Sequence, residues 1–341
     1  TTALLRKQAR SRGLGLRRTP LMRGYAAFDP AGGRWLLLLM EPHLATDHTT
    51  LDVMFEEMAL IRSGRADDLP EPVPFRDFVA RARMGQDAGA HEAFFREMLG
   101  DVDEPTAPFG LMDIQGSGAD IDEAQGMLDP ALSLRIREQA RLLGVSAASL
   151  FHWAWAQVLA KTTGRDDVVF GSVLFGRMQG GMGADRAMGL FINTLPVRIR
   201  LGETDVRDGI RHTHDLLARL LQHEHASLAM AQRCSGLPAN LPLFSALLNY
   251  RHSPSMETDS ALDWEGVALV DGEERSNYPF NLSVDDLGDG FGLNVQVVDR
   301  VGASRIVSYV AQTMSSLVDA LERGVPVPTT RSAFLGAQEC P

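Results

Sequence analysis

Residues 146–174 read SAASLFHWAWAQVLAKTTGRDDVVFGSVL, a helix pattern followed directly by a strand pattern. Ser146 is a residue type that caps helices, and the apolar side chains after it recur at helical spacing up to Lys161. The strand pattern covers residues 167–174, where valine and phenylalanine dominate. We interpret the large apolar residues of this helix as core packing rather than as a ligand-binding group. The stretch therefore predicts a helix and a strand that belong to one core.

The same alternation continues along the chain after this stretch. A helix is expected just before it, over 132–143, and Gly144 stops that helix. Further helices are expected over 206–223 and 303–321, and strands over 124–128, 191–201, 243–250, 280–285 and 293–298. Helices that alternate with strands predict an α/β fold in two layers. A chain of 341 residues is larger than a usual single core, so two lobes are expected.

The part before residue 106 has a shorter pattern. Residues 25–29 and 35–40 predict a β-hairpin around a glycine turn, and the nearly all-apolar second arm predicts an interior strand. Apolar residues from Leu51 onward recur at helical spacing, and a second short helix is expected over 90–99. Residues 100–118 are interpreted as a connector between lobes.

Composition narrows the class of protein. The net charge is −11, with 44 acidic against 33 basic residues, which argues against nucleic acid as a partner. The longest apolar run, 35–40, is far too short to cross a membrane, and the basic start does not resemble a signal peptide. Cys234 and Cys340 are the only cysteines, so neither a disulfide framework nor a zinc ribbon is expected. A reducing cytoplasm fits best. The abrupt start predicts that the chain was cut from a longer protein.

The segment 41–48, EPHLATDH, carries the candidate chemistry because it lies where a strand ends and a helix begins. His43 could take a proton from an amine or hold that amine during attack on a thioester, since histidine is mostly neutral near pH 7. Asp47 is interpreted as a scaffold that caps Thr49 or Thr50 or pairs with an arginine. On spacing alone, a buried structural histidine remains the alternative. A metal site of His43, Asp47 and His48 is disfavoured, because no HExxH pattern is present.

A resemblance to a known family sharpens this interpretation. Residues 42–48 resemble the HHxxxDG motif of the condensation domains of nonribosomal peptide synthetases. Further matching segments are 74–80, 166–172, 175–177, 188–198, 223–228 and 242–252, in the family's order. The run from 166 to 198 is the most specific, and the match spans nearly the whole chain.

Membership implies two chloramphenicol-acetyltransferase-like lobes that form a V, with the histidine motif at their junction and a tunnel for two carrier arms. The first lobe would be truncated, because the family has further elements before the residue that matches Thr1. On this basis we expect the remainder of the first lobe at 1–105, a connector at 106–120, the second lobe at 121–324 and a linker at 325–341.

The resemblance also assigns roles to residues. His43 matches the catalytic histidine and Asp47 the structural aspartate, whereas His48, Arg177 and Asn249 are expected to line the tunnel or support the site. The implied reaction joins an upstream acyl thioester to a downstream aminoacyl thioester. The expected partners are upstream and downstream peptidyl carrier domains and a following adenylation domain, with no nucleic acid or membrane. The only prosthetic group would be the phosphopantetheine arm of each carrier, and no metal is expected.

Two departures from the family motif keep alternatives open. Pro42 stands where the motif has its first histidine, and His48 replaces the final glycine. Proline lacks a backbone donor, and histidine adopts left-handed backbone conformations less readily than glycine. The alternatives are a non-condensing platform that docks a tailoring enzyme such as a hydroxylase, and a variant that also modifies the donor residue with His48 as an extra base.

Overall fold

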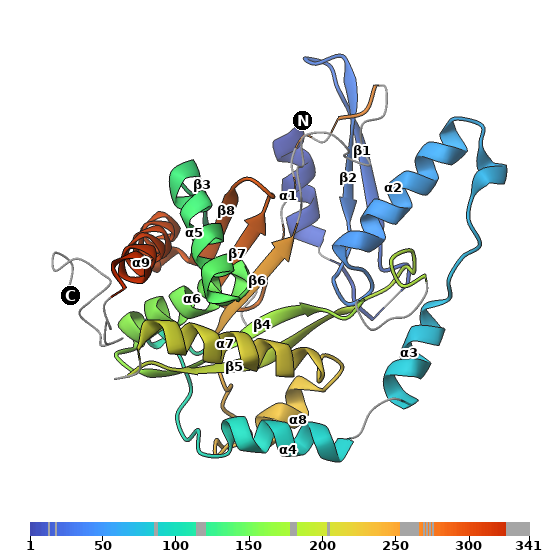
Figure 1. Ribbon diagram of the computed structural model, residues 1–341. Helices are drawn as coiled ribbons and strands as arrows, with labels where there is room; N and C mark the ends of the chain where they lie inside the picture. Colours follow the sequence, from blue (N-terminus) through green and yellow to red (C-terminus); the bar gives the residue numbers. More distant parts are fainter. Residues whose placement is uncertain are drawn as a thin grey trace. The chain divides into compact units, whose positions relative to one another are not determined.

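The computed structural model describes most of the chain up to Gly324 (Figure 1). The residues it leaves undescribed are 13, 18, 85–87, 114–120, 178–182, 203–204, 253–265, 269, 271, 273, 275 and 325–341. Cys340 and the linker expected at 325–341 therefore lie outside the described residues.

The chain divides into two compact units, each made of several separate stretches of the sequence. The first unit contains Thr1–Met84, Gly176–Ile192 and Ala261–Ala268, and the second contains the rest. Residues 85–105, which the sequence analysis places in the first lobe, therefore group with the second unit. Residues 176–192, placed in the second lobe, group with the first unit. The lobe boundaries at 105 and 121 themselves stay a prediction.

The first unit is a short hairpin with helices. Its elements are α1 (Thr2–Arg12), β1 (Arg23–Asp29), β2 (Arg34–Met40), α2 (His48–Arg62), the 3-10 turn η1 (Ala66–Asp68) and α3 (Phe75–Met84). The expected hairpin is confirmed, since β1 and β2 pair antiparallel along their whole length. The helix expected from Leu51 is also confirmed, as part of α2.

The expectation that the second hairpin arm is an interior strand is wrong for the described residues. There β2 pairs with β1 alone, in a two-stranded sheet. Leu36 is buried, but Trp35 and Leu37 on the other face are 71% and 70% exposed. An apolar sequence is compatible with burial on both faces of a strand. Such burial also requires a neighbouring strand and covering layers, and the strand's own sequence does not show whether these are present.

The second unit is built on a six-stranded mixed sheet in the order β3-β8-β7-β6-β4-β5 (Figure 1). The parallel neighbours are β4 with β6 and β6 with β7, whereas β8 runs antiparallel to both β7 and β3. The strands are β3 (Ile121–Met127), β4 (Asp167–Phe175), β5 (Ile192–Arg200), β6 (Ala246–His252), β7 (Phe280–Asp286) and β8 (Phe291–Val298). All six strands lie where the sequence pattern predicts them, within a few residues.

Helices cover this sheet and hold the main core. They are α4 (Ala88–Leu99), α5 (Pro130–Leu143), α6 (Ala147–Thr163), α7 (Val206–Leu221), α8 (Leu228–Arg233) and α9 (Ala303–Arg323), with 3-10 turns η2 (Pro108–Gly110) and η3 (Asp299–Val301). Helices α6 and α9 pack on the sheet and on each other, and α7 packs on α6. Trp153 and Trp155 of α6 are fully buried. The α/β fold class predicted from the sequence is confirmed.

Local signals explain the ends of α5 and α6. Gly144 ends α5 in a left-handed conformation with φ of 71°, which glycine adopts without a steric penalty. The hydroxyl of Ser146 accepts a hydrogen bond from the Ser149 amide and caps α6, as predicted. Within the described part of the chain, no single helix is long and apolar enough to cross a membrane. Helices α5 and α6 are bent by 107° at the short break between them, and they pass the length and apolarity test for a membrane span only when they are taken together.

Candidate functional site

His43 lies in the turn that joins β2 to α2. The turn is closed by a hydrogen bond of 3.0 Å from the Ala45 amide to the Pro42 carbonyl. The ring of His43 is exposed, and its Nδ1 lies 3.2 Å from the Thr46 carbonyl oxygen. Because a carbonyl oxygen only accepts hydrogen bonds, Nδ1 carries the hydrogen in this contact. In a neutral ring Nε2 is then the atom that can take up a proton.

Asp47 is buried and anchors the first turn of α2. Its Oδ1 accepts hydrogen bonds from the Thr50 amide at 2.9 Å and from the Thr50 hydroxyl at 2.8 Å. Its Oδ2 accepts from the Phe191 amide at 3.4 Å. Both arrangements considered for Asp47 are present, since it caps Thr50 and also pairs with an arginine. A carboxylate held this way fixes the start of α2 relative to the turn that carries His43.

Arg177 is the arginine that pairs with Asp47. Its Nη2 lies 2.6 Å from Oδ1 and its Nε 3.2 Å from Oδ2, and the arginine side chain is 11% exposed. The same guanidinium donates to the Ala187 carbonyl at 2.9 Å and to the Ala184 carbonyl, and it lies 4.0 Å from the centre of the Phe191 ring. Of the two roles considered for Arg177, the geometry is that of a salt-bridge residue that ties 176–192 to α2.

An apolar cluster supports the segment 176–192. Phe75 and Phe78 of α3 contact the Phe191 ring, with centroid distances of 5.2 and 4.2 Å. A Cβ at Gly189 would stand 2.3 Å from the Phe75 ring, so only glycine fits there. The Thr50 hydroxyl lies 3.0 Å from both the amide nitrogen and the carbonyl oxygen of Gly189. The segment that carries Arg177 is therefore fixed by packing as well as by charge.

His48 is the first residue of α2, and its ring is exposed. Its Nε2 lies 4.0 Å from the Asp52 carboxylate, one helical turn further along. Burial raises the pKa of Asp52 from its ordinary value, while the His48 ring acts in the opposite direction. The residue that departs from the family motif thus has a carboxylate neighbour of its own.

Asn249 belongs to the second unit, whereas His43, Asp47, His48 and Arg177 all belong to the first. It lies on β6 opposite Ser283 of β7. Its side-chain oxygen Oδ1 is buried and has no hydrogen-bond partner in the described part of the chain. The role expected for Asn249 stays a prediction.

Glu41 is the site residue that sequence reasoning missed. It directly precedes Pro42, and its Oε2 is buried. Burial raises the pKa of the Glu41 carboxyl, and a hydrogen bond from the Thr46 side chain and, after it, the charge of His43 oppose the rise. A carboxylate two residues before a candidate histidine was the signal that could have found it.

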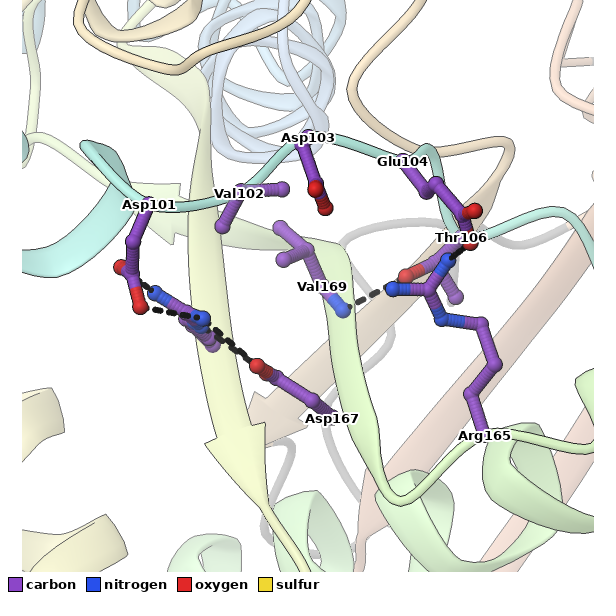
Figure 2. Close-up of a pocket in the computed structure, with 9 residues that line it drawn as sticks. Asp101, Val102, Asp103, Glu104, Thr106, Arg165, Asp167 and Val169 are labelled. Carbon is purple, nitrogen blue, oxygen red and sulfur yellow. Dashed lines mark hydrogen bonds and ion pairs between the residues drawn. The ribbon is translucent and has the colours of Figure 1, made fainter.

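A small cavity in the second unit is structural rather than a substrate site (Figure 2). Its volume of about 20 Å³ holds no more than a water molecule. Arg198 lies beside it, bound to Asp101 and to both oxygens of Asp167, and donating to the Met98 carbonyl at 2.9 Å. The hydrogen bond from Arg198 lowers the pKa of Asp101 to about 2. The last arginine of the 188–198 segment thus links β5 to the loop after α4.

Comparison with known proteins gives consistent matches. The family model described as "Condensation domain" matches residues 1–330. Malpibaldin synthetase of Mortierella alpina is 50% identical over 331 residues, covering 97% of this chain and 6% of that synthetase. Malpinin synthetase of the same organism is 45% identical over 334 residues, covering 98% of this chain and 4% of that synthetase. The chain therefore spans a small part of the curated relatives it matches.

A solved structure shows the same fold. The condensation domain from the Monacolin K polyketide synthase MokA has a TM-score of 0.71 at 20% sequence identity, with 96% of this chain and 77% of that chain covered. At this identity the likeness concerns the fold.

Proposed function

Because this chain belongs to the condensation-domain family of nonribosomal peptide synthetases, we propose that it forms an amide bond between two carrier-bound thioesters at His43. The donor is an upstream acyl or peptidyl thioester, and the acceptor is the amine of a downstream aminoacyl thioester. The thioesters are borne on the phosphopantetheine arms of upstream and downstream carrier domains. The lengthened chain stays on the downstream carrier.

The chemistry needs one group that accepts a proton and passes it on. The neutral amine attacks the thioester carbonyl, so that a C–N bond forms and the nitrogen becomes positively charged. His43 Nε2 takes the proton from this nitrogen, the C–S bond breaks, and the proton passes to the leaving thiolate. Proton transfer by a positioned side chain contributes roughly 10²–10⁴ in rate.

The observation that carries the proposal is the contact between His43 Nδ1 and the Thr46 carbonyl. It orients the ring and selects the tautomer in which Nε2 accepts. The buried pair of Asp47 and Arg177 supports the same turn from the side of α2. Asp47 is thus proposed to hold the site together rather than to touch the reacting atoms.

A non-condensing platform that docks a tailoring enzyme is the second candidate. It is favoured by the two departures from the family motif at Pro42 and His48. It is opposed by the retained His43 and Asp47 and by the intact support around them.

The test uses the complete synthetase module with both carriers loaded. The mass of the intact downstream carrier is compared for the wild type, His43→Ala and the control His212→Ala, an exposed histidine on α7. We expect dipeptidyl product from the wild type and the control, and a loss of roughly 10²–10⁴ in rate for His43→Ala. Equal product from His43→Ala would reject the role of His43. No product from any variant, with carriers competent elsewhere, would favour the platform.

A further inference from the structure

A groove opens on the second unit, where α5, the start of α6 and the last residues of β6 and β7 meet. Its volume is about 450 Å³, which is in the range of small-molecule sites. The amide synthesis proposed above uses none of the groups in it. Its charged and polar lining residues are Arg137, Arg141, Ser146, Tyr250, His252 and Asp286.

The sheet explains why the groove lies there. Strands β6 and β7 are parallel neighbours, and His252 at the end of β6 is paired in register with Asp286 at the end of β7. In open α/β sheets, ligands typically bind in a crevice outside the carboxyl ends of the strands. The groove therefore lies where a sheet of this type commonly binds a ligand.

Asp286 is the one carboxylate among the described residues that line the groove, and its charge is compensated within the protein. Its Oδ1 accepts a hydrogen bond from Arg137 Nη2 at 2.6 Å, and its Oδ2 accepts one from the Tyr250 hydroxyl at 2.6 Å. Burial acts to raise the pKa of Asp286, but the hydrogen bonds from Arg137 and Tyr250 lower it to about 2. Asp286 is therefore an ionised carboxylate that is held by these two neighbours.

The two arginines of the groove keep donors that these contacts do not use. Arg137 and Arg141 are four positions apart on α5, so they lie on the same face of the helix. Arg137 Nη2 donates to Asp286 and, at 3.3 Å, to the Gly290 carbonyl, which leaves Nη1 for another acceptor. The Arg137 guanidinium is also held over the Phe291 ring, 4.2 Å from its centre.

Arg141 supplies a positive charge that no carboxylate of the described part of the chain balances. It is exposed, and no ion pair or hydrogen bond ties its side chain to those residues. Ala147 and Ala148, the first two residues of α6, line the same groove. Their amides belong to the first turn, where a helix offers its N–H groups no acceptor. The groove thus combines unused N–H donors with a net positive charge, in a chain whose net charge is −11.

We propose that this groove binds the phosphate group of a small phosphorylated molecule, which Arg137 and Arg141 hold through their guanidinium groups. Guanidinium groups match the oxygens of phosphate with two parallel hydrogen bonds. Phosphate is favoured over carboxylate because a phosphate monoester carries a charge of about −2 and three strong acceptor oxygens, which suits several donors at once. Ala140 and Val145, which also line the groove, are placed to contact the organic part of the ligand.

The test is the binding of phenyl phosphate to the 341-residue chain, measured by isothermal titration calorimetry. We expect the affinity to fall on the order of tenfold or more in Arg141→Gln, because hydrogen bonds between two charged groups are the strong ones. Arg141→Glu, which reverses the charge, should bind more weakly still. The matched control is Arg211→Gln, which removes the same charge from an exposed position of α7 and should bind like the wild type.

Two calorimetric results would overturn the proposal. One is equal affinity in the wild type and Arg141→Gln. The other is a wild type that does not bind phenyl phosphate at millimolar concentration.

A second measurement shows where the phosphate binds. The chain is isotope-labelled at its alanine backbone nitrogens, and the NMR signals of Ala147 and Ala148 are assigned from their loss in Ala147→Gly and Ala148→Gly. We expect phenyl phosphate to shift both signals in the wild type and to leave that of Ala231, which is buried on α8, in place. Binding that moves neither Ala147 nor Ala148 would place the ligand elsewhere and reject the groove.

Two further ligands separate the possible sources of the anion. Weaker binding of inorganic phosphate than of phenyl phosphate, with the same signals shifted, would support a phosphorylated organic molecule. Equal binding of the two would support the phosphate site and make free phosphate its ligand. Tighter binding of benzoate than of phenyl phosphate would reject phosphate as the group recognised. None of these measurements needs carriers or product, so their outcome is independent of the reaction proposed for His43.

Discussion

Arg177 and Asp47 form a two-point ion pair between residues 130 positions apart in the chain, with Nη2–Oδ1 at 2.6 Å and Nε–Oδ2 at 3.2 Å. The carboxylate is 1% exposed, so neither charge is well hydrated. Pairs of this kind are costly to break from one side, because the remaining charge stays buried without compensation. The pair also holds Arg177 against the start of α2, next to the turn that carries His43.

Replacing Arg177 by methionine should therefore destabilise the protein strongly. We expect the free energy of unfolding to fall by about 3 kcal/mol or more, as for other buried pairs that lose one partner. The matched control is Arg186→Met, since Arg186 pairs with Glu56 at 3.2 Å on an exposed surface. Exposed pairs contribute about 0–1 kcal/mol. Urea denaturation followed by circular dichroism measures the free energy of unfolding of both variants. Equal losses for Arg177→Met and Arg186→Met would contradict the interpretation of Arg177 and Asp47 as a buried ion pair.

Gly209 marks a close approach of α7 to α6. A Cβ at this position would stand 2.2 Å from the ring of Trp153, which is fully buried. Alanine normally stabilises a helix interior by about 1 kcal/mol relative to glycine, but overpacking a core costs about 1–3 kcal/mol. We expect Gly209→Ala to be destabilising on balance. Gly202→Ala, where a Cβ meets nothing within 4 Å, should be neutral in the same denaturation assay.

His152 predicts a dependence of stability on pH. It is buried on α6, with Nδ1 2.7 Å from the Ala148 carbonyl and Nε2 2.9 Å from the Ser172 hydroxyl. Burial lowers the pKa of His152 to about 4, whereas the unfolded chain has the ordinary value near 6.5. The unfolded state therefore binds a proton first, and stability that is present above pH 6.5 is lost as the pH falls toward 4.

The size of the His152 effect follows from the shift. A difference of about 2.5 units corresponds to about 3 kcal/mol at pH 4. Burial also lowers the pKa values of His223 and His225, so the wild type alone does not isolate one group. We expect His152→Gln to lose less stability than the wild type between pH 7 and pH 4.5. Equal losses would show that His152 is not the group responsible.

Most helices and strands were predictable from sequence because their signals are local. The cap at Ser146, the stop at Gly144 and the apolar periodicity between them depend on neighbouring residues. Helix α3 was not predicted, because its apolar positions Phe75 and Phe78 pack on Phe191, more than 100 residues away. The exposure of β2 was mispredicted for a similar reason, since an apolar strand does not reveal which partners are present.

In the candidate site, too, local features were predictable and long-range contacts were not. His43 and Asp47 were singled out by their place between a strand and a helix and, like Arg177, by the family resemblance. Spacing alone could not have paired Arg177 with Asp47, because that contact depends on how the segment 176–192 folds back. Glu41 escaped notice because burial of one carboxylate oxygen cannot be inferred from an exposed-looking loop sequence.

The last prediction concerns Asn249 in the second unit. Its Oδ1 is buried and has no hydrogen-bond partner among the described residues, so truncation to alanine costs little on account of that atom. We expect Asn249→Ala to change the free energy of unfolding by about 1 kcal/mol or less. We expect the same variant to slow peptide formation in the loaded module on the order of tenfold, because a well-placed hydrogen bond is worth about 1 kcal/mol.

The control for Asn249 is Asn294→Ala on β8, where the side chain donates to Glu123 at 2.8 Å on an exposed face. This variant should leave the rate unchanged. Carrier mass measurements and urea denaturation on the same two proteins decide between the roles. A large loss of stability with an unchanged rate would make Asn249 a structural residue of the sheet. A slower rate at unchanged stability would show that the Asn249 side chain acts in the reaction rather than in holding the sheet together.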